Sequence, residues 1–510
     1  MKTQITRLFI IWALTLFSGF IFVADATDTR ITIVHTNDIH GNFAPQAIRS
    51  KEPGQPDRLL GGFVALQAYV SEIRAKNVPV LLLDAGDFMT GNPICDIEFQ
   101  GVRGGVLVEF FNIIGYDGQT LGNHEFDISL DHARELINLA QYPVFSANLF
   151  TTDGRYITDQ PYHIYQKGGI RVGVIGVIVD DLPEYINAPQ KNQVKLRPAA
   201  LVVDSLAMVL DDETDLIVVL SHSSIEMDRK IAKHVGDKID VIVGGHSHTR
   251  MKEAENVNGV LIVQAGAQLA NLGVLHLTVE NDRITDHDYQ LTPLWNEDIT
   301  PDKKLEKMVQ HYQEEIDREY GKVIGELKKP WRRSHFHESN VGNYISDVIR
   351  THSGADIAGI NSGGIRINLD TGPIKKLDIK NLLPFGNTIV VFEATGEEIL
   401  KFIRLNARSS VHQLSGILQL SGLSYECLKT KDNKLEVIQA LINKKQIEAD
   451  KTYRFATVDF VVANWEKYLG FEPRQVTDTQ TTLSELVMHS IEEQNIVSSK
   501  VEGRMLIKRK

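Results

Sequence analysis

Five short polar segments of the chain carry aspartate, asparagine and histidine residues, which bind divalent transition metals through oxygen and nitrogen. The segment 244–248 reads Gly-Gly-His-Ser-His, and this spacing puts two imidazoles on one side of a tight loop. In the segment 37–40, Asp38 and His40 are two residues apart, so an extended backbone would place both side chains on the same side. The candidate metal ligands of the five segments are Asp38, His40, Asp87, Asn123, His222, His246 and His248.

The segment 122–127, Gly-Asn-His-Glu-Phe-Asp, combines three kinds of chemistry. Asn123 offers a neutral oxygen to a cation, and His124 can move a proton near neutral pH. Asp127, three residues further on, can orient that histidine. His124 and Asp127 are therefore the candidate catalytic pair, although the same triplet alone would also suit an ordinary surface loop.

Apolar runs precede these polar segments and predict the elements that position them. Strands are predicted at 31–36, 78–83, 142–148, 170–179, 215–220, 240–243, 261–263 and 274–279. Helical spacing is found at 61–76 and 130–139. Ligands of α/β sheets bind at the carboxyl ends of the strands, so the polar segments are expected to meet at one edge. After the strand at 78–83, Gly86 favours Asp87 as the ligand, while Asp84 is an alternative ligand or a hydrogen-bond acceptor for the loop.

Composition narrows the class of protein. A chain of 510 residues is too long for one ordinary core, so at least two domains are expected. The net charge of −12 argues against a nucleic-acid polymer as the main partner. It also makes an anionic small-molecule substrate depend on local cations. The two cysteines, Cys95 and Cys427, are expected to be free or buried and do not form a thiolate metal site.

The N-terminus has the features of a secretory signal. Lys2 and Arg7 are followed by an apolar run at 8–23, and Ala-Asp-Ala at 24–26 suits cleavage before Thr27. We therefore predict a signal peptide at 1–26 and a periplasmic or extracellular protein that keeps no stable membrane anchor. An uncleaved anchor helix is the alternative.

The pattern changes near residue 291. Apolar residues at helical spacing from Leu305 to Tyr320 predict a long surface helix within a linker at 291–324. Further on, a strand predicted at 356–360 runs into Asn-Ser-Gly-Gly-Ile-Arg, and Leu-Pro-Phe-Gly-Asn follows at 383–387. The glycine pair allows a ligand to approach the backbone, with Arg366 as an anion or sugar contact and Phe385 as a stacking face. A plain turn is the alternative.

Taken together, the polar segments resemble the metallophosphoesterase family, whose motifs are Asp-x-His, Gly-Asp, Gly-Asn-His-Glu, His and Gly-His-x-His. Their order matches across 31–280. The segments 35–41 and 122–127 are similar to the exported 5′-nucleotidase branch, which includes UDP-sugar hydrolases and 2′,3′-cyclic nucleotide phosphodiesterases. The resemblance implies a four-layer α/β metallophosphoesterase sandwich at 27–290, followed by a smaller α/β substrate-binding domain at 325–510.

The resemblance also implies two divalent metal ions, which are Zn, Mn, Fe or Co for such nitrogen and oxygen ligands. The first implied ligand set is Asp38, His40, Asp87 and His248. The second is Asp87, Asn123, His222 and His246. Two such ions activate water and clamp a phosphoryl group. His124, oriented by Asp127, is then left to stabilise the phosphoryl charge or to protonate the leaving oxygen.

The C-terminal motifs resemble the 5′-nucleotidase C-terminal domain, in which the base of the substrate lies between two aromatic rings. The positions that match its substrate-binding residues are Asn361, Gly363, Gly364, Arg366, Phe385 and Phe460. The segment 501–504 is similar to the last strand of that domain. Two features depart from the pattern: the family's Gly-Gly-Asp-Gly loop is missing after Phe460, and His335 stands where an arginine is usual.

The leading functional expectation is release of phosphate from nucleoside 5′-monophosphates by metal-activated water. Within the enzyme class, the alternatives are a 2′,3′-cyclic nucleotide phosphodiesterase, a UDP-sugar hydrolase and a thiosulfate-ester hydrolase. Outside that class, a degenerate module that captures nucleotides is the alternative. The complete set of candidate ligands argues against it, because a pseudoenzyme is expected to have lost at least one of Asp87, Asn123 or His246.

Overall fold

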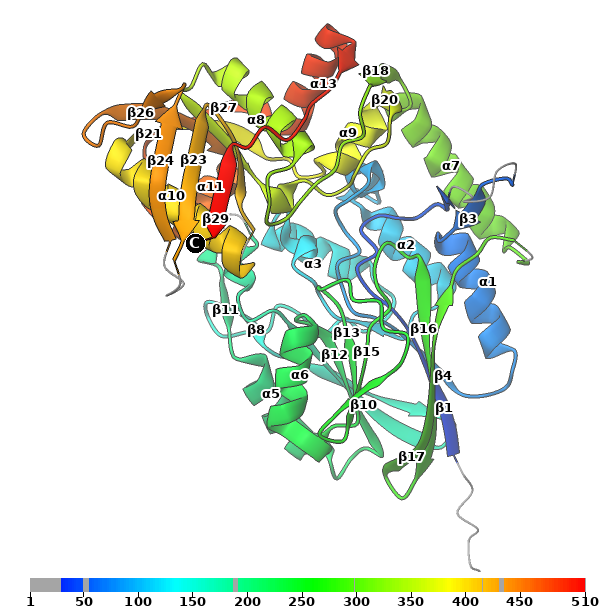
Figure 1. Cartoon of the computed structure of the whole chain (residues 1–510). Coiled ribbons are helices and arrows are strands. Elements are labelled where there is room, and N and C mark those ends of the chain that lie inside the picture. The colour runs from blue at the N-terminus through cyan, green and yellow to red at the C-terminus, as the bar shows by residue number, and fades with distance from the viewer. Residues whose placement is uncertain are drawn as a thin grey trace, which may run out of the picture.

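The computed structural model describes residues 29–48, 55–186, 191–297, 299–414, 416–430 and 435–509. The predicted signal peptide at 1–26 lies outside these residues. Within the described ranges, no helix is both long and apolar enough to cross a bilayer. In Figure 1 the blue-to-green N-terminal part lies below, and the yellow-to-red C-terminal part lies above it.

Two sheets form the centre of the N-terminal part. In spatial order, the first contains β17 (Arg283–Pro293), β16 (Asn271–Glu280), β1 (Thr29–Thr36), β4 (Val80–Asp84) and β7 (Gly118–Gln119). The second contains β14 (Glu255–Val257), β15 (Val260–Val263), β13 (Val241–Gly244), β12 (Leu216–His222), β10 (Ile170–Ile178) and β9 (Tyr162–Lys167). The pairs β1–β4, β4–β7, β10–β12 and β12–β13 are parallel, so the carboxyl ends of these strands share one edge of each sheet.

Helices cover the outer faces of both sheets. They are α1 (Phe63–Arg74), α2 (Gly105–Ile114), α3 (Leu130–Leu139), α5 (Ala199–Leu210) and α6 (Ile225–Val235). Alternate residues of β1 separate two cores, because Ile33 packs with the second sheet while Val34 packs with α1 and α2. The four-layer α/β sandwich expected from the sequence is therefore confirmed. Ser129 begins α3 by accepting a hydrogen bond from the main-chain nitrogen of His132 at 2.9 Å.

Short strand pairs occupy the loops, and one predicted strand does not form. The short strands are β2 (Gln46–Ile48), β3 (Arg58–Leu60), β5 (Glu98–Phe99), β6 (Val102–Arg103), β8 (Leu149–Thr151) and β11 (Val194–Leu196). The strand predicted at 142–148 is wrong, because this segment bonds to both sheets in turn. The main-chain nitrogen of Phe145 donates to Gln119 of the first sheet, while that of Ala147 donates to Gly176 of the second.

The helix predicted after residue 291 is α7 (Lys303–Tyr320), which runs along the upper right of Figure 1 between the two parts. Asp302 begins it by accepting hydrogen bonds from the main-chain nitrogens of Lys304 and Leu305 at 3.0 and 2.8 Å. Leu305, Val309 and Ile316 are buried in the core beneath α1 and α2. The helix also contacts α9 (Lys376–Leu382) of the C-terminal part.

Three sheets form the C-terminal part. The largest has the order β22 (Leu418–Ser421), β19 (Ile357–Asn361), β26 (Thr452–Val458), β21 (Thr388–Thr395) and β27 (Arg474–Thr482). The second has the order β25 (Lys445–Gln446), β24 (Leu435–Ile442), β23 (Leu423–Lys429) and β29 (Met505–Arg509). The third has the order β20 (Gly372–Lys375), β18 (Val323–Leu327) and β28 (Ile496–Val497). The segment 501–504, expected to be the last strand, lies just ahead of β29.

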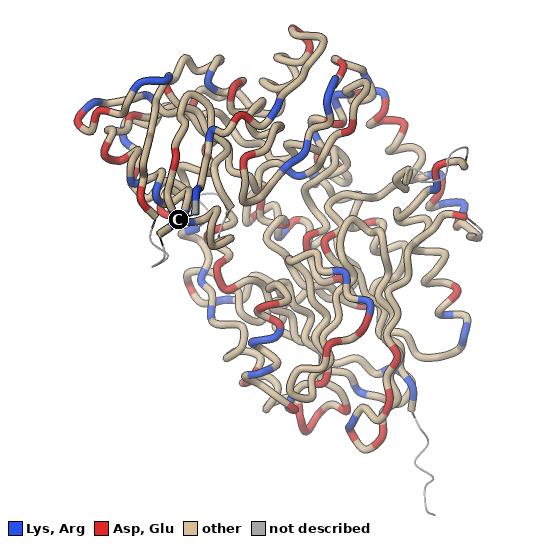
Figure 2. Tube along the Cα trace, in the orientation of Figure 1, with Lys and Arg blue, Asp and Glu red and all other residues tan. Residues whose placement is uncertain are grey.

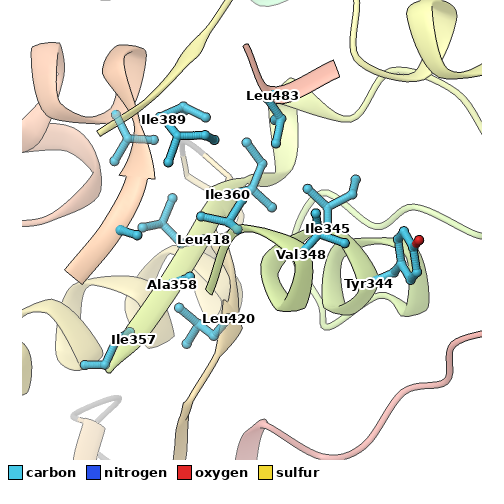
Figure 3. Packing of buried hydrophobic residues seen from close by; sticks show 14 of the residues in the cluster. Tyr344, Ile345, Val348, Ile357, Ala358, Ile360, Ile389, Leu418, Leu420 and Leu483 are labelled. Atoms are coloured by element: carbon cyan, nitrogen blue, oxygen red, sulfur yellow. The ribbon is translucent and has the colours of Figure 1, made fainter. Parts of the chain in front are cut away.

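A separate hydrophobic cluster holds this part together. Its other helices are α8 (Asn340–Ser353), α10 (Gly396–His412), α11 (Asp459–Ala463), α12 (Trp465–Tyr468) and α13 (Leu483–Gln494). Figure 3 shows Ile360 of β19 close to Leu418 of β22, on the side of the strand that faces Ile345 and Val348 of α8. Every fully buried member of this cluster lies between Ile324 and Val497. Cys427 is one of them, and it and Cys95 are free and buried, as expected.

His35 on β1 makes stability depend on pH. Its side chain is fully buried, and neither ring nitrogen has a hydrogen-bond partner among the described residues. Burial lowers the pKa of His35 to about 3. The unfolded chain therefore binds the proton first, at its ordinary pKa of 6.5, and stability is lost as the pH falls below that value. Between about pH 6.5 and pH 4.5, we expect the free energy of unfolding of His35→Phe to fall by about 2 kcal/mol less than that of wild type.

Urea denaturation at a series of pH values measures this effect. His287→Phe is the matched control, because His287 is exposed on β17 and its removal should leave the pH profile of wild type unchanged. Identical acid sensitivity in His35→Phe and wild type would contradict the prediction.

Candidate active site and metal centre

The first group of candidate ligands lies beyond the ends of β1 and β13. Nε2 of His248 is 3.3 Å from Oδ1 of Asp38 and 3.1 Å from Nε2 of His40. The backbone at Asp38 and His40 is not extended as expected, because both residues have positive φ angles of 52° and 50°. The turn is held by the main-chain nitrogens of Asp38 and His40, which donate to Gly86 and Asp87 at 2.9 and 3.0 Å.

The second group lies beside the first and centres on Asp87, beyond the end of β4. Oδ2 of Asp87 is 3.1 Å from Nε2 of His222, the last residue of β12. Nδ1 of His246 is 2.9 Å from Oδ1 of Asn123, which joins the amide to this group. Ligand atoms of Asp87 lie within 4.8 Å of those of both His40 and His222. All seven candidate ligands predicted from the sequence therefore meet, with Asp87 between the two groups.

The hydrogen bonds of the histidines leave nitrogens turned toward the cluster. Nδ1 of His40 donates to the carbonyl of Thr90 at 2.9 Å, and Nδ1 of His222 donates to the carbonyl of Ala85 at 2.7 Å. Nε2 therefore keeps its lone pair in both rings when they are neutral. Nε2 of His222 is buried, and its 3.1 Å contact with Oδ2 of Asp87 does not have hydrogen-bond geometry. A buried nitrogen of this kind beside a carboxylate fits a divalent cation.

Electrostatics support the same assignment. Burial opposes ionisation of Asp87, but His222 and His124 outweigh it and hold the pKa of Asp87 well below its ordinary value. Burial also opposes protonation of His222, but Asp87 and Asp38 raise the pKa of His222 to about 10. The buried carboxylates therefore need positive charge beside them. A bound cation would supply that charge, and His222 would then serve as a ligand in its neutral form.

Loop residues hold the ligands in place over long sequence distances. Nδ2 of Asn37 donates to Oδ2 of Asp38 at 2.6 Å, and its Oδ1 accepts from the main-chain nitrogen of Ala265 at 2.9 Å. Gln264 donates to the carbonyl of Gly245 at 2.9 Å, within the His-x-His loop. These contacts tie the loop after β1 to the loops around β13 and β15.

His124 and Asp127 form the expected pair. Nδ1 of His124 is 2.7 Å from Oδ2 of Asp127, and the same oxygen accepts from the hydroxyl of Thr90 at 2.6 Å. Burial lowers the pKa of His124, but Asp127 and Asp87 outweigh it, so the net pKa is raised. Nε2 of His124 faces Oδ2 of Asp87 at 3.8 Å. His124 also groups with His40 and Asp87 as a possible ligand set, so its position suits either role.

Glu125 is a positioning residue that the sequence reasoning missed. Its buried carboxylate accepts four main-chain hydrogen bonds, from Gly122 at 2.7 Å, Asp87 and Phe88 at 3.0 Å, and Met89 at 3.2 Å. Burial and the neighbouring Asp87 raise the pKa of Glu125 to about 7. The residue joins the loop that bears Asp87 to the loop that bears Asn123. The only feature of the sequence that could have pointed to Glu125 was its place directly after His124, in the segment 122–127.

Asp84, the alternative to Asp87, has the structural role considered for it. Its Oδ1 accepts from the main-chain nitrogen of Gly86 at 3.0 Å and from Gln119 at 2.9 Å. Its Oδ2 accepts from the hydroxyl of Thr36 at 2.7 Å. Asp84 thus stabilises the loop that bears Asp87 by hydrogen bonds.

The C-terminal candidates are only partly brought to this cluster. The ring of Phe385 stacks on His124 with centroids 5.7 Å apart, and the guanidinium of Arg366 lies 5.8 Å from the Phe385 centroid. Phe460, in α11, instead packs against Tyr468, with the two ring centroids 6.1 Å apart. Among the described residues, Phe385 and Phe460 form no ring pair. Asn361 ends β19, and Gly363 and Gly364 lie in the short 3₁₀ turn that follows it.

The N-terminal part is a two-sheet sandwich with clustered Asp, His and Asn donors at its strand ends, and a second α/β unit follows it. Together these features define a metal-dependent phosphoester hydrolase. Residues 31–250 match the calcineurin-like phosphoesterase family, and residues 323–472 match the 5′-nucleotidase C-terminal domain. The chain therefore belongs to the metallophosphoesterases that carry a 5′-nucleotidase C-terminal domain, and it is an enzyme of that class.

Individual relatives span nearly the whole chain. Protein UshA of Yersinia enterocolitica is 27% identical over 86% of both chains. A 5′-nucleotidase of Vibrio parahaemolyticus is 26% identical over 91% of this chain and 90% of its own. The crystal structure of a 5′-nucleotidase precursor from Thermus thermophilus has a TM-score of 0.83 and 26% identity, covering 94% of this chain and 99% of its own.

Proposed function

We propose that the chain is an exported, dinuclear phosphohydrolase that releases phosphate from nucleoside 5′-monophosphates. The observation that carries the proposal is the pair of ligand groups around Asp87, with His124 turned toward them. One ion would be held by Asp38, His40, Asp87 and His248. The other would be held by Asp87, Asn123, His222 and His246. Two bound divalent ions supply a water of lowered pKa and positive charge against the phosphoryl oxygens.

The chain's own residues supply the remaining steps. Asp127 and Asp87 raise the pKa of His124 and so favour its protonated form, from which Nε2 can donate to a phosphoryl oxygen or give a proton to the leaving oxygen. Asp127, fixed by Thr90, keeps the ring in the orientation that this transfer needs. No carboxylate of the described residues lies within ion-pair distance of Arg366, so its guanidinium is available to an anionic or sugar group.

The division proposed from the sequence gives a catalytic domain at 27–290, a linker at 291–324 and a substrate-binding domain at 325–510. The N-terminal and C-terminal parts have separate hydrophobic clusters, and Leu305, Val309 and Ile316 of the proposed linker pack in the N-terminal one. Acidic and basic residues are interspersed along the trace of both parts in Figure 2. Export would leave Thr27 as the first residue, which mass spectrometry of the mature protein measures.

Metal analysis together with a substrate panel tests the proposal. We expect about two divalent ions per chain and phosphate release from nucleoside 5′-monophosphates. The panel should include a 2′,3′-cyclic nucleotide, a UDP-sugar and an aryl phosphate. Metal-replete protein that hydrolyses none of these esters would overturn the proposal.

Truncation of Phe385 should affect nucleotides selectively. The ring lies over the catalytic histidine and beside Arg366, where the leaving group of a nucleotide would pass. We expect Phe385→Ala to raise KM for nucleoside monophosphates about tenfold, as loss of one base-stacking contact would. Turnover of a simple aryl phosphate should stay nearly unchanged. Phe385→Tyr is the control that keeps the ring, and an equal loss on both substrates would reject stacking at this position.

A further inference from the structure

Two lysine side chains cross between the N-terminal and C-terminal parts. Nζ of Lys191 donates to the carbonyl of Ala463 at 3.0 Å and to Oδ1 of Asn464 at 2.6 Å. In the opposite direction, Nζ of Lys467 lies 3.1 Å from Oε2 of Glu184. The contacts therefore join the short segment 463–468 to residues of the catalytic part by hydrogen bonds and an ion pair.

Lys467 is the more enclosed member of its ion pair. Its side chain is 17% exposed, compared with 53% for Glu184. Its ammonium also lies 4.8 Å from the centroid of Tyr185, a cation–π distance. The aliphatic stem is thus packed while the charge contacts both an anion and an aromatic face, so the side chain is held more firmly than in an exposed pair.

On each side, the residues that these lysines contact lie next to a candidate residue of the proposed active site. On the catalytic side, the Tyr185 ring lies edge-on to His246, with centroids 5.2 Å apart. On the other side, Asn464 is buried and its Nδ2 donates to the carbonyl of Phe460 at 2.9 Å. Lys191 and Lys467 therefore connect a candidate metal ligand with a candidate ring of the substrate site.

The geometry points to Lys191 and Lys467 as positioning residues that hold the segment 463–468 against Glu184 and Tyr185 and thereby set the placement of the candidate substrate residues relative to the metal ligands. The inference rests on the proposed function, because it assumes that the leaving group of the substrate contacts the C-terminal part. All candidate metal and catalytic residues lie within 38–248, and all candidate substrate residues lie within 361–460. The relative placement of these two sets then depends on contacts of this kind.

One of the two lysines lies at a departure noted in the sequence. Where the family has a Gly-Gly-Asp-Gly loop after the second ring, this chain forms the short helix α12, and Lys467 of that helix contacts Glu184.

A charge swap tests the inference in the full-length, metal-replete protein. Lys467→Glu and Glu184→Lys each place like charges together, and each should raise KM for a nucleoside monophosphate about tenfold. The double variant, Glu184→Lys with Lys467→Glu, restores opposite charges and should recover most of that loss. kcat for an aryl phosphate should stay within about twofold in all three variants. Lys191→Met should change KM in the same direction as the single swaps.

A distance measurement separates this inference from the proposed function. Spin labels on Lys230→Cys and Lys401→Cys report the separation of the two parts by pulsed electron spin resonance, whether or not any substrate is turned over. The distance distribution should broaden in Lys467→Glu and narrow again in the double variant. Lys451→Glu, an exposed charge reversal in the same part, is the control and should change neither KM nor distance. Unchanged distances in Lys467→Glu, or losses that simply add in the double variant, would overturn the inference.

Discussion

Replacement of His124 by alanine is expected to lower kcat by about 10²–10⁴-fold, the contribution of one positioned proton donor. The reason is that the raised pKa of His124 favours the protonated ring, whose Nε2 lies 3.8 Å from Asp87. Oδ2 of Asp127 fixes the ring by its contact with Nδ1 at 2.7 Å. The side chain is not needed to hold either proposed ion, so metal content should match wild type. Phosphate-release kinetics and elemental analysis of the same preparation measure both quantities.

Two comparisons make this result specific. Asp127→Asn should lose less activity than His124→Ala, because it keeps the ring in place and weakens only its orientation and charge. His163→Ala, a half-buried histidine on β9 away from the cluster, should retain wild-type kinetics. Loss of a metal ion in His124→Ala would instead identify His124 as a ligand, which its proximity to His40 and Asp87 allows.

The elements that carry the site were predictable because their apolar patterns are strong. The helix predicted at 130–139 matches α3, and the strand predicted at 215–220 lies within one or two residues of β12. Polar residues directly after such strands were then expected at one sheet edge, and the parallel pairing puts them there. Local periodicity and a general rule of α/β sheets were sufficient for this part.

The shape of the loops was not predictable in the same way. Asp38 and His40 meet in a turn with positive φ angles, where an extended segment was expected. That turn depends on Asn37 and its hydrogen bond to Ala265, more than two hundred residues away in the sequence. Glu125 likewise acts on main-chain nitrogens of a different loop. Contacts of this kind leave no periodic signal in the sequence.

The candidate substrate residues of the C-terminal part were the least predictable from the sequence. Phe385 and Phe460 are predicted to lie on either side of a base, which stays a prediction. In the structure Phe385 stacks on His124 and Phe460 contacts Tyr468. The spacing of two rings in different loops depends on how the two parts of the chain are placed. Side chains such as Lys191 and Lys467 contribute to that placement, and their partners are set by the tertiary structure rather than by local sequence.

Conversion of Asp87 to asparagine is expected to lower the metal content from about two ions to one or fewer and to reduce kcat by about 10³-fold. Asp87 lies between the two ligand groups, with Oδ2 at 3.1 Å from His222 and Oδ1 accepting from the main-chain nitrogen of His124 at 2.9 Å. Asparagine keeps the shape of the side chain but removes the negative charge that two cations in close proximity require. Elemental analysis and kinetics at saturating metal measure the change.

Thermal unfolding with and without added metal provides a readout that does not depend on turnover. A ligand that binds only the folded state at 100 times its Kd stabilises it by about 2.7 kcal/mol, so metal addition should raise the Tm of the chelator-treated wild type. The increase should be much smaller in Asp87→Asn. Asp84→Asn is the matched control, because Asp84 is equally buried three residues earlier but bonds only to Thr36, Gln119 and the loop. This control should be less stable than wild type yet keep its metal-induced increase in Tm. An equal metal response in Asp87→Asn and wild type would contradict the shared position of Asp87, because the two ligand groups would then bind independently of the residue that joins them.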